Sequence, residues 1–309
     1  MNGPIRFRRA AAVAFAMLAL APASAFAGTL SSSGSVVTYT GDGGANDVLI
    51  TQSGNTITVT DPNSAIERGD GCSLDDPGDP FVASCTLTSI SQVRVYVGGG
   101  NDRVRASTVS EAMDIDSGPG LDTITAGTKS DSIDGGAERD IVNGHLGSDV
   151  IWGNYGNDSL AGSHGNDTVN GGPGNDNVQG NEDDDTLHGG DGDDDVLGGT
   201  GNDQANGYFG DDELEGQAGD DVLFGSYGAD VVHGGTEDDL LQGNAGNDKL
   251  SGQAGLDSYE GGTDADQIYS VDDADEDVDC GGGSDAATLN LGDSILFGSC
   301  ENFSFLPKP

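Results

Sequence analysis

The residues whose type and spacing could do chemistry are aspartates. From Asp122 to Asp266 an aspartate stands at every ninth position, seventeen in a row. Five residues before the aspartate lies a glycine in fifteen of the seventeen units, and residues 171–179, for example, read GGPGNDNVQ. Carboxylate and carbonyl oxygens in a flexible, glycine-rich turn suit calcium, which takes about 6–8 oxygen ligands. Zinc and softer metals are disfavoured, because the repeat contains no cysteine and only scattered histidines.

Nine residues of this kind predict a turn followed by a short strand. Glycines at the first and fourth positions permit a positive φ and close backbone approach, so the first six residues should form the turn. The last three should form a strand whose eighth-position side chain points inward, while the seventh and ninth point outward. Two units make an 18-residue coil with two strands. The predicted fold is therefore all-β: a parallel β-roll, a two-sheet solenoid of nine-residue repeats.

The predicted core is thin, since only the eighth position supplies it. This position is aliphatic almost throughout, from Ile124 to Ile268, and Ala205 predicts a locally underpacked spot. One such side chain in nine cannot offset the ordering of the backbone, which costs about 1–2 kcal/mol per residue. Aspartates on the same edge, only one coil apart, should also repel one another. A cation between them would relieve this repulsion.

The unit resembles the RTX (repeats-in-toxin) nonapeptide, G-G-x-G-x-D-x-U-x, over about half of the chain. The resemblance implies a calcium-binding parallel β-roll, in which each calcium is held between turns on the same edge, one coil apart. Carbonyls of the turn glycines and of position five would add further oxygens. The carboxylate ligands on one edge would be Asp149, Asp167, Asp185, Asp203, Asp221, Asp239 and Asp257. Those on the other edge would be Asp140, Asp158, Asp176, Asp194, Asp212, Asp230, Asp248 and Asp266.

The fourth position departs from glycine in five units. Lys129 and Glu138 open the run, so the first coils are expected to bind calcium poorly or to serve as a cap. Asp183, Glu237 and Asp264 add a carboxylate beside the predicted ligands. Two interpretations stay open for these three residues: they tighten the neighbouring sites, or they are merely solvated.

The chain divides into four predicted parts. Residues 1–27 resemble a secretory signal peptide, with a basic start, a short apolar stretch and the cleavage pattern Ala25-Phe26-Ala27. Residues 28–110 contain β-branched runs between turns and are expected to form a small N-terminal β cap domain. Residues 111–270 form the roll, and residues 271–309 are expected to cap its other end. Weaker copies of the repeat stand at 41–49, 98–104 and 281–285.

Four cysteines lie outside the repeats, in two close pairs: Cys72 with Cys85, and Cys280 with Cys300. An exported chain with an even number of cysteines favours disulfides. Four cysteines allow three connectivities, and pairing of sequence neighbours needs no contact between the ends of the chain. These features predict a secreted protein that is extracellular or associated with a cell surface.

The net charge of the chain limits the classes of partner that it can bind. The chain carries a net charge of −43, and loss of the three arginines in residues 1–27 would make it −46. Nucleic acid and anionic lipid are therefore implausible partners. Beyond residues 1–27, no segment is apolar enough to span a bilayer, so no membrane insertion is expected.

Three classes of function follow. The favoured class is a secreted calcium-binding β-roll whose folding depends on calcium, with a structural or surface-associated role. The second is a calcium-dependent adhesin or carbohydrate-binding module, whose partner would be a cell-surface glycan or protein. The third is an extracellular enzyme of unrecognised type. The second rests on outward aromatic residues: Trp152, Tyr155, Tyr208, Phe209, Phe224 and Tyr227.

The sequence favours a protein that is not an enzyme. It contains neither H-E-x-x-H nor G-x-S-x-G, the signatures of metalloproteases and of many lipases. His188 and His233 stand five units apart, an odd number that places them on opposite sheets. A shared zinc site or a base–nucleophile pair is therefore not expected.

Overall fold

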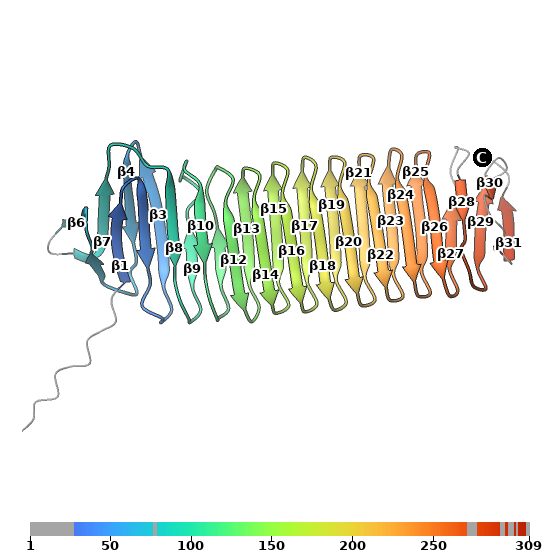
Figure 1. Ribbon diagram of the computed structural model, residues 1–309, viewed down its shortest axis with the longest axis horizontal. Coiled ribbons are helices and arrows are strands. Elements are labelled where there is room, and N and C mark those ends of the chain that lie inside the picture. Colours follow the sequence, from blue (N-terminus) through green and yellow to red (C-terminus); the bar gives the residue numbers. More distant parts are fainter. Residues whose placement is uncertain are drawn as a thin grey trace, which may run out of the picture.

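The computed structural model describes residues 28–76, 79–270, 277–290, 294–295, 300 and 302–306. Within these ranges all regular structure is β, and there is no helix long and apolar enough to cross a membrane. The strands lie across a long axis and alternate between two layers (Figure 1). The predicted signal peptide lies outside these ranges.

Two sheets, here called sheet A and sheet B, run the length of the molecule. Beyond the N-terminal hairpins, even-numbered strands form sheet A and odd-numbered strands form sheet B, each paired in parallel with the strand one coil away. This arrangement confirms the predicted two-sheet β-roll. In sheet A these strands are β8 (Gln92–Tyr96), β10 (Met113–Asp116), β12 (Ser132–Ala137), β14 (Val150–Tyr155), β16 (Thr168–Pro173), β18 (Thr186–Asp191), β20 (Gln204–Phe209), β22 (Val222–Tyr227), β24 (Leu240–Ala245), β26 (Ser258–Thr263), β28 (Asp277–Asp279) and β30 (Ser294–Ile295). In sheet B they are β9 (Arg103–Arg105), β11 (Thr123–Thr125), β13 (Ile141–Leu146), β15 (Ser159–His164), β17 (Asn177–Glu182), β19 (Asp195–Thr200), β21 (Glu213–Ala218), β23 (Val231–Thr236), β25 (Lys249–Ala254), β27 (Gln267–Ser270), β29 (Ala286–Asn290) and β31 (Asn302–Leu306).

The strands of the roll are longer than the sequence predicts. Most contain six residues, the last three of one unit and the first three of the next, as in β16. Pairing of β16 with β18 runs from Thr168↔Thr186 to Pro173↔Asp191 and passes over the first-position glycine. The prediction of three-residue strands was therefore wrong. Because identical backbone conformations repeat every 18 residues, parallel hydrogen bonding continues on both sides of that glycine.

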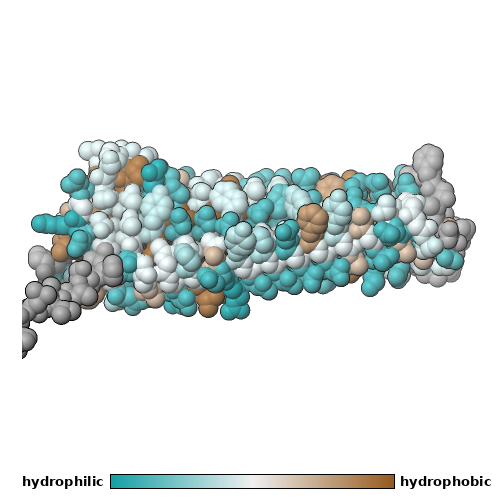
Figure 2. All heavy atoms as spheres, turned by 60° about the horizontal axis from the view of Figure 1, so that its bottom comes forward, coloured by the Kyte–Doolittle hydropathy of each residue, from teal (hydrophilic) through white to brown (hydrophobic). Residues whose placement is uncertain are grey.

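The core follows the eighth position, as predicted. These side chains are at most 3% exposed from Ile124 to Ile268, and they belong to one core cluster that runs from Leu30 to Leu289. Ala205 is fully buried and pairs in register with Leu187 and Leu223. Outside the core, the visible face of the molecule is mostly hydrophilic, with isolated hydrophobic residues (Figure 2).

The N-terminal region adds antiparallel hairpins to the same two sheets. Sheet A ends in β2 (Val36–Thr40), β1 (Gly28–Ser33) and β5 (Ile66–Arg68). Sheet B ends in β3 (Asp47–Ser53), β4 (Thr56–Thr60), β7 (Asp79–Thr86) and β6 (Cys72–Asp76). Strands β2 and β3 pair in parallel with β8 and β9, so both sheets continue without a break across the boundary expected at residue 110.

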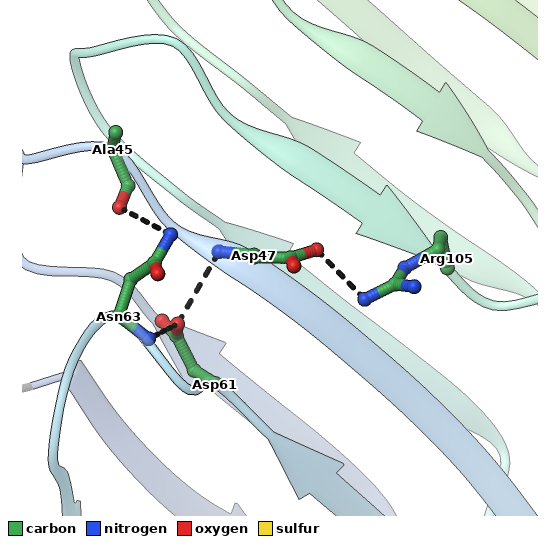
Figure 3. Close-up of polar contacts among 5 residues, drawn as sticks. All are labelled: Ala45, Asp47, Asp61, Asn63 and Arg105. Carbon is green, nitrogen blue, oxygen red and sulfur yellow. Dashed lines mark hydrogen bonds and ion pairs between the residues drawn. The ribbon is translucent and has the colours of Figure 1, made fainter.

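Polar contacts fix this junction (Figure 3). Arg105 on β9 donates to a carboxylate oxygen of Asp47 on β3 at 2.7 Å. Asp61 accepts hydrogen bonds from the backbone N–H groups of Asp47 and Asn63, at 3.2 and 3.0 Å. The hairpin end is therefore tied to the first coil by an ion pair as well as by the sheets.

Disulfides join Cys72 to Cys85 and Cys280 to Cys300. The first links β6 to β7 in the N-terminal hairpins. Near the C-terminus, β28 to β31 extend both sheets in parallel. The region expected to cap this end therefore continues the coils wherever it is described.

Glycine has two different roles in the turns. Positive φ occurs at the second and fourth positions, as at Gly172 (106°) and Gly174 (154°), and not at Gly171 in the first. The expected positive φ at the first position was therefore wrong. Gly171 is required by close approach instead: a Cβ there would lie 2.4 Å from Oδ2 of Asp176 and 2.5 Å from the carbonyl oxygen of Gly189.

This close approach predicts unequal effects of two glycine substitutions, one in the roll and one in an open hairpin turn. Gly171→Ala should lower the free energy of unfolding by about 1–3 kcal/mol, because the new methyl group overlaps buried oxygens. Gly54→Asn should cost about 1 kcal/mol or less, because asparagine tolerates left-handed backbone and Gly54, with a φ of 57°, has nothing within 4 Å of the place of a Cβ. Urea unfolding of both variants in calcium-containing buffer measures the difference. Equal destabilisation would contradict the close-approach role.

Candidate metal centre

The fifteen aspartates predicted as ligands lie in two files, one along each edge of the roll. Each aspartate ends a turn, directly before a strand. Along each file the backbone N–H of one aspartate donates to Oδ1 of the aspartate one coil further on, at 2.7–3.0 Å. The file before sheet A holds Asp149, Asp167, Asp185, Asp203, Asp221, Asp239 and Asp257. The file before sheet B holds Asp140, Asp158, Asp176, Asp194, Asp212, Asp230, Asp248 and Asp266.

These carboxylates are buried, and fourteen of them leave one oxygen unsatisfied. All fifteen side chains are at most 3% exposed. In the fourteen, Oδ1 accepts a backbone hydrogen bond, whereas Oδ2 is buried without a hydrogen-bond partner within the described part of the chain. A buried carboxylate oxygen without a partner is costly, so repetition of this feature indicates a missing cation. The unsatisfied Oδ2 atoms belong to Asp140, Asp149, Asp158, Asp167, Asp176, Asp185, Asp194, Asp203, Asp212, Asp221, Asp230, Asp239, Asp248 and Asp266.

Backbone oxygens converge on the same turns. Oδ2 of Asp176 and the carbonyl oxygen of Gly189 both face the space where Gly171 lacks a side chain. The carbonyl oxygen of Gly156 faces the corresponding space at Gly174. In the ranges described, no three His, Cys, Asp or Glu side chains gather around one point. A metal ion here would therefore combine carboxylate with carbonyl oxygens, the donor set of calcium and not of zinc. The participation of position-five carbonyls stays a prediction.

Electrostatics make the files unfavourable without a cation. Burial raises the pKa of Asp140, Asp149 and Asp185 to about 8. Backbone hydrogen bonds to each carboxylate act in the opposite direction, and the neighbouring aspartates one coil away raise the pKa further. Near neutral pH the metal-free roll would therefore hold protons on many of these groups. A divalent cation would instead favour the charged carboxylates.

The start of the repeat differs on one edge, that of Asp131. Both oxygens of Asp131 accept backbone hydrogen bonds, from Met113 at 2.7 Å and from Gly127 at 2.8 Å. The carboxylate of Asp131 thus stabilises a turn through both of its oxygens, and neither oxygen is left unsatisfied. Its fully paired carboxylate explains why the metal-binding pattern begins after it on this edge.

The other edge extends beyond the residues predicted from the sequence. Asp102 and Asp122 precede Asp140 in the same hydrogen-bonded file, and Asp285 follows Asp266. All three added residues are buried, each with an unpaired Oδ2 within the described chain. The degenerate repeats at 98–104 and 281–285 were the signal for Asp102 and Asp285. They were missed as ligands because each lies 19 or 20 residues, not 18, from its neighbour in the file.

Two of the acidic residues at the fourth position, Asp183 and Glu237, contact the backbone of the preceding coil. Oδ2 of Asp183 accepts from the N–H of Gly165 at 3.0 Å, and Oε2 of Glu237 accepts from the N–H of Gly219 at 3.1 Å. Both residues adopt a φ of 77°. Their carboxylates therefore link neighbouring turns, a role that neither of the two sequence interpretations included.

Comparison with known families agrees with this geometry. The model of the RTX calcium-binding nonapeptide repeat (4 copies) matches residues 116–151, 144–178, 170–205, 206–241 and 233–268. No curated protein matches the chain. The five matches overlap or adjoin across the aspartate files, and through residues 116–268 the chain belongs to the RTX calcium-binding nonapeptide repeat family.

Proposed function

We propose that this calcium-binding β-roll is a secreted protein whose folding depends on calcium, with a structural or surface-associated role. The observation that carries the proposal is the repeated buried Oδ2 without a partner along both edges. Each calcium would be held by aspartates of successive coils, with carbonyl oxygens of the turn glycines completing its shell. Calcium supplies the positive charge that lets these carboxylates stay ionised while buried.

Dependence of folding on calcium follows from the balance of forces in one coil. Each 18-residue coil buries two core side chains, such as Val169 and Val178, together with two carboxylates, such as Asp167 and Asp176. The apolar contribution is small against the entropy of ordering 18 residues. Ion binding would supply the remaining free energy, as in other proteins whose metal site forms only on folding.

The disulfides support secretion. Both cysteine pairs are joined as disulfides, which persist in oxidising compartments.

A second candidate function is an adhesin or carbohydrate-binding module. All six aromatic residues singled out in the sequence lie on sheet A, in β14, β20 and β22. Their gathering on one sheet favours a binding face over random surface coverage. The enzyme alternative gains no comparable support, because His188 on β18 and His233 on β23 lie on different sheets.

Calcium should fold the roll. We expect EDTA-treated mature protein to lack most β structure and to gain it on addition of calcium, at about 10⁻⁴–10⁻³ M for an extracellular module. Magnesium at equal concentration should not replace calcium, because it demands a smaller, octahedral shell. Far-UV circular dichroism during the two titrations measures both effects. Full β structure in EDTA would refute calcium-dependent folding.

Neutralising one aspartate in a file should lower the number of calcium ions that the chain binds. Asp203→Asn keeps an oxygen for the N–H of Asp185 but loses the carboxylate, so up to two bound calcium ions per chain should be lost. Asp131→Asn is the matched control, since both oxygens of Asp131 already accept backbone hydrogen bonds. Calorimetric stoichiometry compares the two variants. An equal loss of calcium in both would be inconsistent with ions held between stacked turns.

Stability should depend on pH in opposite ways with and without calcium. The folded-state pKa values are raised from 3.8 to between about 6 for Asp203 and about 8 for Asp140. A raised pKa stabilises the metal-free fold below pH 3.8, and this contribution is lost as pH rises through 6 to 8. In EDTA, acidification towards pH 4 should therefore increase β structure.

Calcium must displace the same protons, so its affinity should rise between pH 5 and 8. Calorimetry at pH 7 in two buffers of different ionisation enthalpy counts the protons released. Binding without proton release would show that the carboxylates are already ionised in the metal-free protein.

A further inference from the structure

In one column of side chains on sheet A, the aromatic residues end at Tyr227. The column is formed by the last residue of successive strands, and the register pairs Phe209 with Tyr227, Tyr227 with Ala245, and Ala245 with Thr263. The rings of Phe209 and Tyr227 are stacked, with centroids 4.9 Å apart and an angle of 9° between their planes. Both residues are more than half exposed. The stack stops at Tyr227 because the next position holds only the methyl group of Ala245.

A hollow of about 430 Å³ lies beside this end of the stack. Tyr227, Ala245 and Thr263 line it, together with Ser226, Asn244 and Glu260. One face of the Tyr227 ring is covered by Phe209, which precedes it in the column. The other face is turned towards Ala245 and therefore forms an aromatic wall of the hollow. The space has room for one further ring in the stack.

Polar groups surround this wall. Oε2 of Glu260 accepts a hydrogen bond from the side-chain amide of Gln242 at 2.9 Å, which fixes its position on the sheet. Asn244 has a positive φ of 73° and is exposed; its amide donates to the carbonyl oxygen of Gln242 at 3.5 Å and keeps one N–H and its oxygen for a ligand. The hollow thus combines one aromatic face with amide, carboxylate and hydroxyl groups.

We propose that this hollow, the Tyr227 slot, binds a neutral hexopyranose residue of a glycan. The C–H face of the sugar stacks on Tyr227, and its hydroxyls bond to Asn244 and Glu260. A pyranose has an apolar face and a polar rim, which match an aromatic wall with a few placed polar groups. The assignment rests on the second proposed function and gives it a site and a ligand class.

The negative charge of the site and the cost of desolvating its polar groups favour a neutral sugar over other ligands. Glu260 and the net charge of −43 repel sulfated or uronate sugars and phosphate groups. An apolar peptide side chain would bury the polar groups of Asn244 and Glu260 without partners, which is unfavourable. A neutral sugar satisfies these groups with its hydroxyls.

The test uses the full mature chain saturated with calcium and an array of neutral glucan, mannan, galactan and chitin oligosaccharides. The best-bound oligosaccharide is then titrated by calorimetry against three variants. Tyr227→Ala removes the wall, and Ala245→Phe extends the stack and fills the slot; each should weaken binding by about tenfold or more. Tyr269→Ala is the matched control, an exposed tyrosine on β27 of the opposite sheet, and should leave the affinity within about twofold of the parent chain.

Circular dichroism of every sample separates the two proposals. A chain that stays unfolded in calcium overturns the calcium-dependent β-roll and the Tyr227 slot with it. A folded chain that binds none of the neutral oligosaccharides overturns the slot and leaves the calcium-dependent β-roll standing. Binding that survives both Tyr227→Ala and Ala245→Phe also overturns it. Because Tyr227 is exposed and Ala245→Phe adds apolar surface, the slot is tested by two independent changes.

Discussion

The structure depends on one electrostatic constraint: every nine residues, a carboxylate is buried one coil away from another carboxylate. In water this arrangement would cost only about 1 kcal/mol per pair of carboxylates, but Asp140 and Asp185 are nearly inaccessible to solvent. Their burial raises the pKa to about 8, far above the ordinary value of 3.8. A fold that repeats this cost along both edges requires protons or cations as a component. Calcium satisfies the requirement because it accepts carboxylate and carbonyl oxygens in a flexible turn.

The other features of the roll follow from that constraint. The first-position glycine is needed because the carboxylate occupies the place of its Cβ, as at Gly171. The hydrogen bond from each aspartate N–H to the next carboxylate keeps the two files in register with the sheets. The core is only one side chain deep in each sheet, and bound calcium would supply the part of the stabilisation that this core cannot. The sheet faces are left free to vary, and sheet A carries the aromatic residues at Phe209 and Tyr227.

Much of this arrangement could be predicted because its period is strict. The spacing of nine residues placed aliphatic residues inward and assigned the aspartates to alternate edges, and both follow from strand geometry alone. The β-branched runs expected between turns in residues 28–110 overlap strands such as β2, β3, β4 and β8. The nine-residue period could not predict that strand pairing extends beyond Gly171, because this pairing depends on contacts between coils. Nor could it show that the N-terminal hairpins join the same sheets, since that is a matter of tertiary pairing between β2 and β8. The degenerate turns at Asp102 and Asp285 were invisible to a strict nine-residue count, although the coil geometry absorbs their extra residues.

The central claim is that cations lie between successive turns, beside the buried carboxylates of both files. A crystal structure of the mature protein grown in calcium, with anomalous scattering used to identify the ions, tests it most directly. The account predicts two rows of calcium, one along each edge, spaced by about one coil, or roughly 4.8 Å. Each ion should contact Oδ2 of an aspartate such as Asp176 or Asp203. Ordered coils with their aspartate Oδ2 atoms buried and no calcium beside them would contradict the account.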